Sequence, residues 1–118
     1  MNLFEIKRII ENNPIAFATV SENYRPNVIA VASAKVVLKN KLLITDVFMK
    51  QTKKNILGNK NVCLTVWNKN WQGYKLIGRA EYFARGKWKN FVDKIKENKN
   101  EKIKGAILVK ISRISPLH

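Results

Sequence analysis

Short segments with strand character make up most of this chain, and they constrain its fold more than any other feature. Each segment is rich in Val, Ile, Leu or aromatic residues and is bounded by residues that favour turns, such as Asn, Gly and Pro. Because neighbouring segments are joined by short turns, we expect an antiparallel sheet that curls into a barrel and so hides its edges. The predicted strands are Ile15–Val20, Pro26–Leu38, Leu42–Val47, Val62–Trp67, Tyr74–Phe83 and Ala106–Ile114.

Three predicted helices flank these six strands. Apolar residues recur at helical spacing over Asn2–Asn12 and again over Lys87–Lys99, and a short helix between them ends at Gly58. Gly78 interrupts the fifth strand, which predicts a bulge or the close approach of another backbone. The expected fold class is mainly β with flanking α, in a single domain over residues 1–118.

The sequence contains no segment with the length and apolar character of a membrane span, which needs roughly 20 residues. Its N-terminus also lacks the basic-then-apolar order of a signal peptide. We therefore expect a cytoplasmic protein without membrane contact. The single cysteine, Cys63, excludes an internal disulfide, and its apolar neighbours indicate a packed thiol rather than a reactive one.

The formal net charge of +15 raises the question of nucleic-acid binding, because clustered Lys and Arg gain affinity from phosphate contacts. Of the 23 basic residues, 18 are lysines, and they are spread along the chain. Residues that read base edges are more often arginines, whose guanidinium makes bidentate contacts. A solvated lysine-rich surface explains the composition more simply, so a small basic nucleic-acid-binding β-barrel is kept only as the alternative function.

The sequence contains none of the common combinations of catalytic side chains. His118, the only histidine, is the last residue, so neither a Ser-His-Asp nor a Cys-His set is expected. The one cysteine and one histidine do not supply a usual zinc site, and the eight acidic residues lack the spacing of a calcium loop. We therefore predict no metal site and identify no catalytic residue. Any chemistry is expected to be carried by a bound organic cofactor.

The stretch from Leu42 to Ile56 runs from an apolar strand through a short polar turn into a basic helix. The first turn of a helix has backbone N–H groups without intrahelical partners, and its dipole favours negative charge. A phosphate group therefore fits this junction, with the Thr52 hydroxyl and a nearby lysine completing the site.

Five segments, in this order and at these spacings, resemble the FMN-binding split-barrel family, which is typified by pyridoxamine 5′-phosphate oxidase and small flavin-binding proteins. They are Pro14–Val20, Arg25–Val31, Asp46–Asn55, Val62–Trp67 and Gly73–Tyr82, and the resemblance covers nearly the whole chain. It implies a six-stranded antiparallel split β-barrel of Greek-key type. It also implies a homodimer with two FMN sites at the subunit interface. Lys50 and Gln51 depart from the family, which usually has glycine and a basic residue at these positions.

The resemblance also implies which residues bind the cofactor. The second and third strands run along the flavin, main-chain groups of Thr45–Val47 lie beside its ring, and Gln72 is near a flavin-contacting glutamine brought from the other side of the interface. Lys35 and Thr52 match positions that reach the phosphate. The full expected set is Val31, Ala32, Ser33, Lys35, Thr45, Asp46, Val47, Lys50, Gln51, Thr52 and Gln72.

Several of these residues have an alternative role that the sequence leaves open. Lys35 is equally well explained as a solvated strand lysine, and Asp46 as a turn cap that accepts nearby backbone N–H groups. Thr52 is also explained as a plain helix N-cap. The cation that pairs with the phosphate is either Lys50 or Lys53.

The activity is less constrained than the cofactor. True pyridoxamine 5′-phosphate oxidases continue into a C-terminal segment with an arginine and a histidine that grip the substrate, and this chain lacks that segment, so vitamin B6 oxidation is not expected. Two flavin hypotheses remain: an FMN-dependent oxidoreductase acting on a small-molecule substrate or redox partner, and a non-enzymatic flavin carrier or electron-transfer protein. Some similar proteins use a deazaflavin, so FMN and a deazaflavin both remain open.

Overall fold

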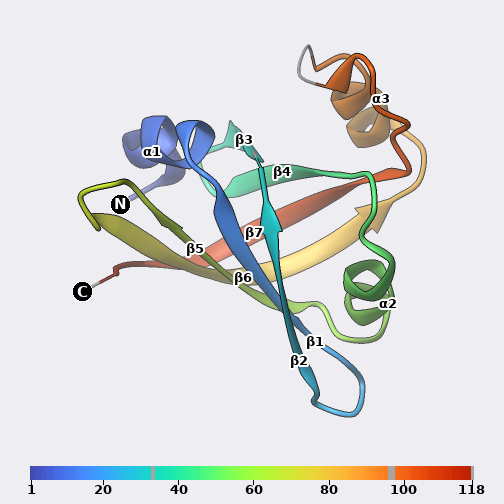
Figure 1. The fold of residues 1–118 in the computed structure, drawn as a ribbon, viewed down its shortest axis with the longest axis horizontal. Helices are drawn as coiled ribbons and strands as arrows, with labels where there is room; N and C mark the ends of the chain where they lie inside the picture. Colours follow the sequence, from blue (N-terminus) through green and yellow to red (C-terminus); the bar gives the residue numbers. More distant parts are fainter. Residues whose placement is uncertain (33, 96–97, 118) are drawn as a thin grey trace.

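In the computed structural model, which describes residues 1–32, 34–95 and 98–117, seven strands form one antiparallel sheet that bends around a central core (Figure 1). The strand order is β2-β1-β5-β6-β7-β4-β3, so β2 and β3 are the two edge strands. The sheet is therefore not closed, and the expectation that a barrel hides its edges is wrong for these two strands. An open sheet of this kind fits the split-barrel fold. The strands are β1 (Ile15–Val20), β2 (Pro26–Val31), β3 (Ala34–Leu38), β4 (Lys41–Asp46), β5 (Asn61–Trp67), β6 (Gly73–Phe83) and β7 (Gly105–Pro116).

The mainly β, antiparallel fold is confirmed, but the count of six strands is wrong. The predicted strand Pro26–Leu38 is two strands, β2 and β3, which lie at opposite ends of the sheet. Val31 and Ala34 are both buried in the main core. In one continuous strand these two residues would face opposite sides of the sheet. The chain therefore has to change direction between them, and the two halves pair with different neighbours.

The three predicted helices are present, with adjusted bounds. The N-terminal helix consists of a 3₁₀ turn, Leu3–Ile6, followed by α1 (Lys7–Asn12), and α2 (Lys50–Gly58) ends at the glycine that the sequence indicates. The last helix, α3 (Lys87–Asp93), is shorter than predicted. The Val92 carbonyl accepts bonds from Ile95 N–H and from the Asn98 side chain, and these contacts end the helix. No helix in the described part of the chain is long and apolar enough to cross a membrane.

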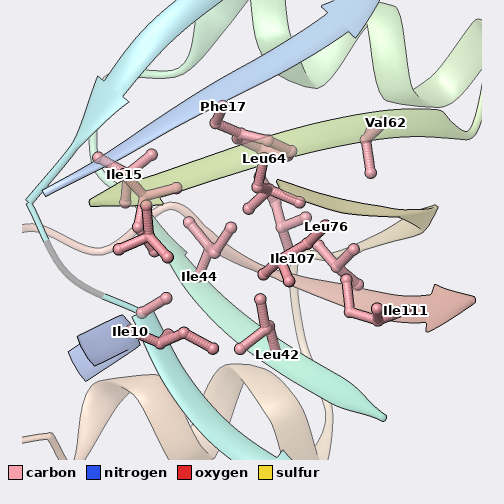
Figure 2. Packing of buried hydrophobic residues seen from close by; sticks show 14 of the residues in the cluster. Ile10, Ile15, Phe17, Leu42, Ile44, Val62, Leu64, Leu76, Ile107 and Ile111 are labelled. Carbon is pink, nitrogen blue, oxygen red and sulfur yellow. The ribbon is translucent and has the colours of Figure 1, made fainter. Parts of the chain in front are cut away.

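The main core lies inside the bent sheet. Figure 2 shows side chains from α1 and the strands pointing toward one another, among them Ile10, Phe17 and Leu76. A smaller cluster lies on the other face of β4 and β7, where α3 covers Leu43 and Ala106. The sheet is thus covered on both faces near α3.

The predicted irregularity at Gly78 is confirmed. The β6–β7 register shifts between Ile77 and Gly78. A Cβ atom at residue 78 would lie 2.2 Å from the backbone oxygen of Lys110, so the neighbouring strand approaches too closely for any side chain. The extra residue of this bulge is Ser112 on β7, and the bulge helps the β6–β7 pair to bend around the core.

Candidate functional site

A cavity of about 640 Å³ lies between the edge strand β2, the end of β4 and the start of α2. Because one edge of β2 faces away from the sheet, its outward backbone N–H and C=O groups are available to a ligand. The volume is in the range of small-molecule sites, roughly 300–1,000 Å³. The lining residues are Asn27, Ile29, Ala30, Val31, Ala32, Thr45, Val47, Phe48, Met49, Lys50, Gln51, Thr52, Asn98 and Glu101.

Most of the cofactor-binding residues expected from the sequence meet at this cavity. Val31, Ala32, Thr45, Val47, Lys50, Gln51 and Thr52 all line it. Ser33 lies outside the described residues. The remaining three, Lys35, Asp46 and Gln72, lie elsewhere, as described below.

The first turn of α2 presents backbone donors to the cavity. Lys53 N–H makes the first intrahelical bond, to the Met49 carbonyl at 2.8 Å, so the N–H groups of residues 50–52 precede the helical ladder. The N-cap residue, Met49, has no capping side chain. Since Met49 and residues 50–52 all line the cavity, the positive end of the helix dipole faces it.

Thr52 is not the N-cap of α2, which is Met49, so the N-cap interpretation is wrong for this residue. It is the third residue of α2 and is only 1% exposed. Its Oγ1 accepts a 3.4 Å hydrogen bond from Asn27 Nδ2 on β2. Thr52 is buried because the helix packs its inner face against β1 and β2, which the local sequence does not reveal.

Two lysines were candidates for the cation at this site, and the structure separates them. Lys50 is exposed and is the one basic side chain among the described lining residues. Lys53 instead places its Nζ 4.7 Å from the centre of the Tyr82 ring, outside the set of lining residues. Gln51 donates from Nε2 to Asn55 Oδ1 at 2.8 Å, so its amide is held against the helix.

Asp46 caps the turn that leads into α2. It is 1% exposed, and its Oδ1 accepts a 2.7 Å bond from Met49 N–H. Its Oδ2 accepts a 2.5 Å bond from the Tyr82 hydroxyl on β6. Burial raises the pKa of the Tyr82 phenol above its usual range, and the hydrogen bond to Asp46 and the charge of that carboxylate raise it further. The turn-cap interpretation of Asp46 is therefore confirmed.

Asn98 and Glu101 form a wall of the cavity that the sequence did not reveal. They follow α3, and Asn98 donates from Nδ2 to Thr45 Oγ1 at 3.0 Å and to the Val92 carbonyl at 2.8 Å. Glu101 is the one acidic side chain among the described lining residues. No periodic pattern marks these positions, and the contact with Thr45 spans 53 positions in the chain.

Lys35 and Gln72 lie away from the cavity within one protomer. Lys35 is half-buried on β3, and its neighbours Ala34 and Val36 point into the main core while it points to the other face. Gln72 is on the β5–β6 loop and lines a different cavity, of about 1030 Å³, together with Trp71. In Figure 1 this loop lies on the opposite side of the sheet's core from α2. Within one protomer, Gln72 therefore does not line the first cavity.

Comparison with known proteins finds one matching family and one related sequence. The family described as pyridoxamine 5′-phosphate oxidase matches residues 4–117. An uncharacterized protein of Methanocaldococcus jannaschii is 36% identical in an alignment of 114 residues that covers 93% of this chain and 76% of that protein.

Two solved structures resemble the fold. HupZ of Group A Streptococcus has a TM-score of 0.90 at 23% identity, covering 99% of this chain and 94% of that one. An FMN-binding protein from Syntrophomonas wolfei has a TM-score of 0.74 at 18% identity, covering 98% of this chain and 82% of that one. At these identities the two structures establish the shared fold.

Proposed function

The chain belongs to the pyridoxamine 5′-phosphate oxidase family, and from that premise we propose that it is an FMN-binding flavoprotein. The cofactor is assigned to the cavity between β2, β4 and α2. Membership of the family concerns ancestry and fold, and it does not make this chain a vitamin B6 oxidase. Similarity to an FMN-binding protein of the same fold supports the choice of cofactor.

The proposal rests on the arrangement of hydrogen-bond donors at one end of the cavity. The uncapped first turn of α2 and the exposed Lys50 lie together there, and such a helix start binds phosphate. Away from α2, the cavity continues along the free edge of β2, past the small side chains Ala30 and Ala32. An elongated ligand with a phosphate at one end and a flat ring at the other fits this arrangement.

Each part of the cavity then has a role. Lys50 and the N–H groups of residues 50–52 hold the phosphate, and Thr52 fixes the helix against β2 through Asn27. The free edge of β2 and the end of β4 at Thr45 and Val47 offer main-chain groups to the polar edge of the ring. FMN, when bound, supplies one- and two-electron transfer chemistry. The protein is accordingly proposed to act as an oxidoreductase or an electron-transfer protein.

A homodimer is part of the proposal, and the outer face of the sheet supports it. Val28, Ala18, Cys63 and Ile77 are cross-strand neighbours on β2, β1, β5 and β6, and they form an apolar row on the face opposite the main core. Val28 is 64% exposed and Ile77 36% exposed. Burying such a row against a second copy stabilises the dimer through the hydrophobic effect. Cys63, expected as a packed thiol, is half-buried on this face.

This apolar face adjoins the cavity. Ala30 follows Val28 on the same face of β2 and also lines the cavity. A partner seated on the face would therefore border the cofactor, and its β5–β6 loop, with Gln72 and Trp71, is the part expected to reach it.

Ligand titration of the purified protein tests the proposed function. We expect FMN to bind at least roughly tenfold more tightly than riboflavin, since only FMN carries the phosphate. A parallel titration with a phosphate-bearing deazaflavin decides between the two ring systems. Bleaching of bound FMN by reduced nicotinamide cofactors, followed by reoxidation with candidate acceptors, would then separate an oxidoreductase from a carrier.

Two results would contradict the proposal. Equal affinities for FMN and riboflavin would remove the phosphate assignment. A protein that binds no flavin but binds oligonucleotides with steep salt dependence would be the basic nucleic-acid-binding barrel instead.

A further inference from the structure

We infer that Tyr82 is a positioning residue for the phosphate end of the flavin site, acting through Asp46 on the turn that leads into α2. The inference rests on the proposed binding of FMN. Neither Tyr82 nor Asp46 is among the residues that line the cavity, so both act at one remove from the ligand.

Asp46 is the last residue of β4 and is almost fully buried. Within the described residues, its carboxylate accepts two hydrogen bonds, one from Met49 N–H and one from the Tyr82 hydroxyl. A buried carboxylate is costly unless donors satisfy it. Loss of the tyrosine hydroxyl would leave Oδ2 without its donor and would favour movement of the carboxylate toward water.

Asp46 is connected to the cavity through Met49, the residue immediately before α2. Asp46 Oδ1 accepts the hydrogen bond from Met49 N–H, and Met49 and the two residues before it line the cavity. Because no side chain caps α2, this contact sets the direction in which the chain joins the helix. A displaced Asp46 would therefore turn the donors of residues 50–52 away from the phosphate position.

Tyr82 is held in place by contacts on several sides. Its ring packs against the main core, and Lys53 of α2 lies over the ring with its Nζ 4.7 Å from the ring centre. Gly105 is the cross-strand partner of Asp46 on β7 and leaves room for the Tyr82 hydroxyl. A Cβ atom at residue 105 would lie 2.4 Å from that hydroxyl oxygen. The tyrosine thus links β6, β4 and the first turn of α2 at one point.

Tyr82→Phe tests this role when FMN and riboflavin are compared as ligands of the full chain. The substitution keeps the ring and removes only the donor. We expect the Kd for FMN to rise roughly tenfold and the Kd for riboflavin to stay within about twofold, since only FMN uses the phosphate end. Tyr24→Phe, which removes the same hydroxyl from an exposed turn, should change neither affinity.

Gly105→Ala provides an independent perturbation, because the new methyl group overlaps the Tyr82 hydroxyl and ring edge and so forces the tyrosine to move without removing its hydroxyl. It should give the same selective loss of FMN affinity. All affinities refer to the folded fraction, measured by far-ultraviolet circular dichroism.

The outcomes separate this inference from the proposed function. If the wild-type protein prefers FMN to riboflavin and Tyr82→Phe changes both affinities equally or neither, the tyrosine has only a structural role and the inference is overturned. If the wild-type protein shows no preference for FMN, the proposed function fails, and the inference fails with it.

Discussion

Asn55 of α2 donates a 2.9 Å hydrogen bond from Nδ2 to Oγ1 of Thr19 on β1, and the two side chains are 2% and 3% exposed. Asn55 Oδ1 also accepts the bond from Gln51, so one buried amide joins the cavity wall to the sheet. This polar contact, rather than apolar packing alone, fixes how α2 sits on β1.

The first prediction follows from that contact. Asn55→Ala should lower the free energy of unfolding by about 1–3 kcal/mol, because it leaves the buried Thr19 hydroxyl without a partner. Urea unfolding measures the change. Asn23→Ala, in the exposed β1–β2 turn, is the control and should stay within about 0.5 kcal/mol of the wild type. An equal, small effect of both substitutions would show that the buried bond contributes little.

The second prediction compares two glycines given the same substitution. Gly78→Ala should destabilise the protein by more than about 2 kcal/mol, because the new Cβ meets the rigid backbone oxygen of Lys110 at 2.2 Å. In Gly58→Ala, the atoms nearest to the new Cβ belong to the side chain of Glu22, which is exposed and can move. The change in unfolding free energy should therefore stay within about 1 kcal/mol. Midpoints of thermal unfolding would distinguish them, and similar losses would contradict the bulge argument.

The sequence predicts those features of this fold that depend on local pattern. β1 begins and ends where predicted, because Ile15, Phe17 and Thr19 alternate with outward-facing residues. The end of α2 at Gly58 and the bulge at Gly78 are also marked by the residues themselves. The turn cap at Asp46 belongs to the same group, since the carboxylate and Met49 N–H are three positions apart.

The features that were missed depend on contacts between distant segments. The division of residues 26–38 into two strands is set by which sheet neighbours each half finds. Tyr82 reaches Asp46 across 36 positions, and Asn98 reaches Thr45 across 53. Thr52 is buried where α2 packs against the sheet, and its hydroxyl accepts a bond from Asn27, 25 positions away. Neither spacing nor composition carries such information, so the donors at the cavity were predictable while their supports were not.

The third prediction concerns pH and Tyr82. Unfolded tyrosine has a pKa of about 10, and the pKa of folded Tyr82 is raised. Above about pH 10 the unfolded state therefore binds fewer protons than the folded state, and stability falls by at most about 1.4 kcal/mol per pH unit. Tyr82→Phe lacks this loss. The stability difference between wild type and Tyr82→Phe should be constant below about pH 9 and shrink above it in urea titrations; parallel curves would contradict it.

The fourth prediction concerns the two lysines of the first turn. Lys50→Ala should weaken FMN binding roughly tenfold and leave riboflavin binding unchanged, because its ammonium lies at the phosphate end of the cavity. Lys53→Ala removes the same charge from the helix, but its Nζ lies over the Tyr82 ring, so a smaller loss is expected. Fluorescence titration at two salt concentrations measures both. A larger loss for Lys53→Ala would reassign the phosphate's cation.

The fifth prediction concerns the apolar row on the outer face of the sheet. Ala18 lies between Val28 and Cys63 in this row, so Ala18→Arg places a large charged group in the middle of the proposed dimer contact. A charge without a partner in a buried interface is costly, and the variant should be monomeric at concentrations where the wild type is dimeric. Light scattering coupled to size-exclusion chromatography measures the mass.

The control for this variant is Glu81→Arg, an exposed position on the outer face of β6 outside the apolar row. It adds more positive charge than Ala18→Arg does, yet it should leave the dimer intact, because it does not touch the row. If the monomeric Ala18→Arg protein also binds FMN more weakly while remaining folded, the partner contributes to the cavity, which Ala30 borders on the same face of β2. A wild-type protein that is monomeric at tens of micromolar, or an Ala18→Arg variant that stays dimeric, would assign another role to this face.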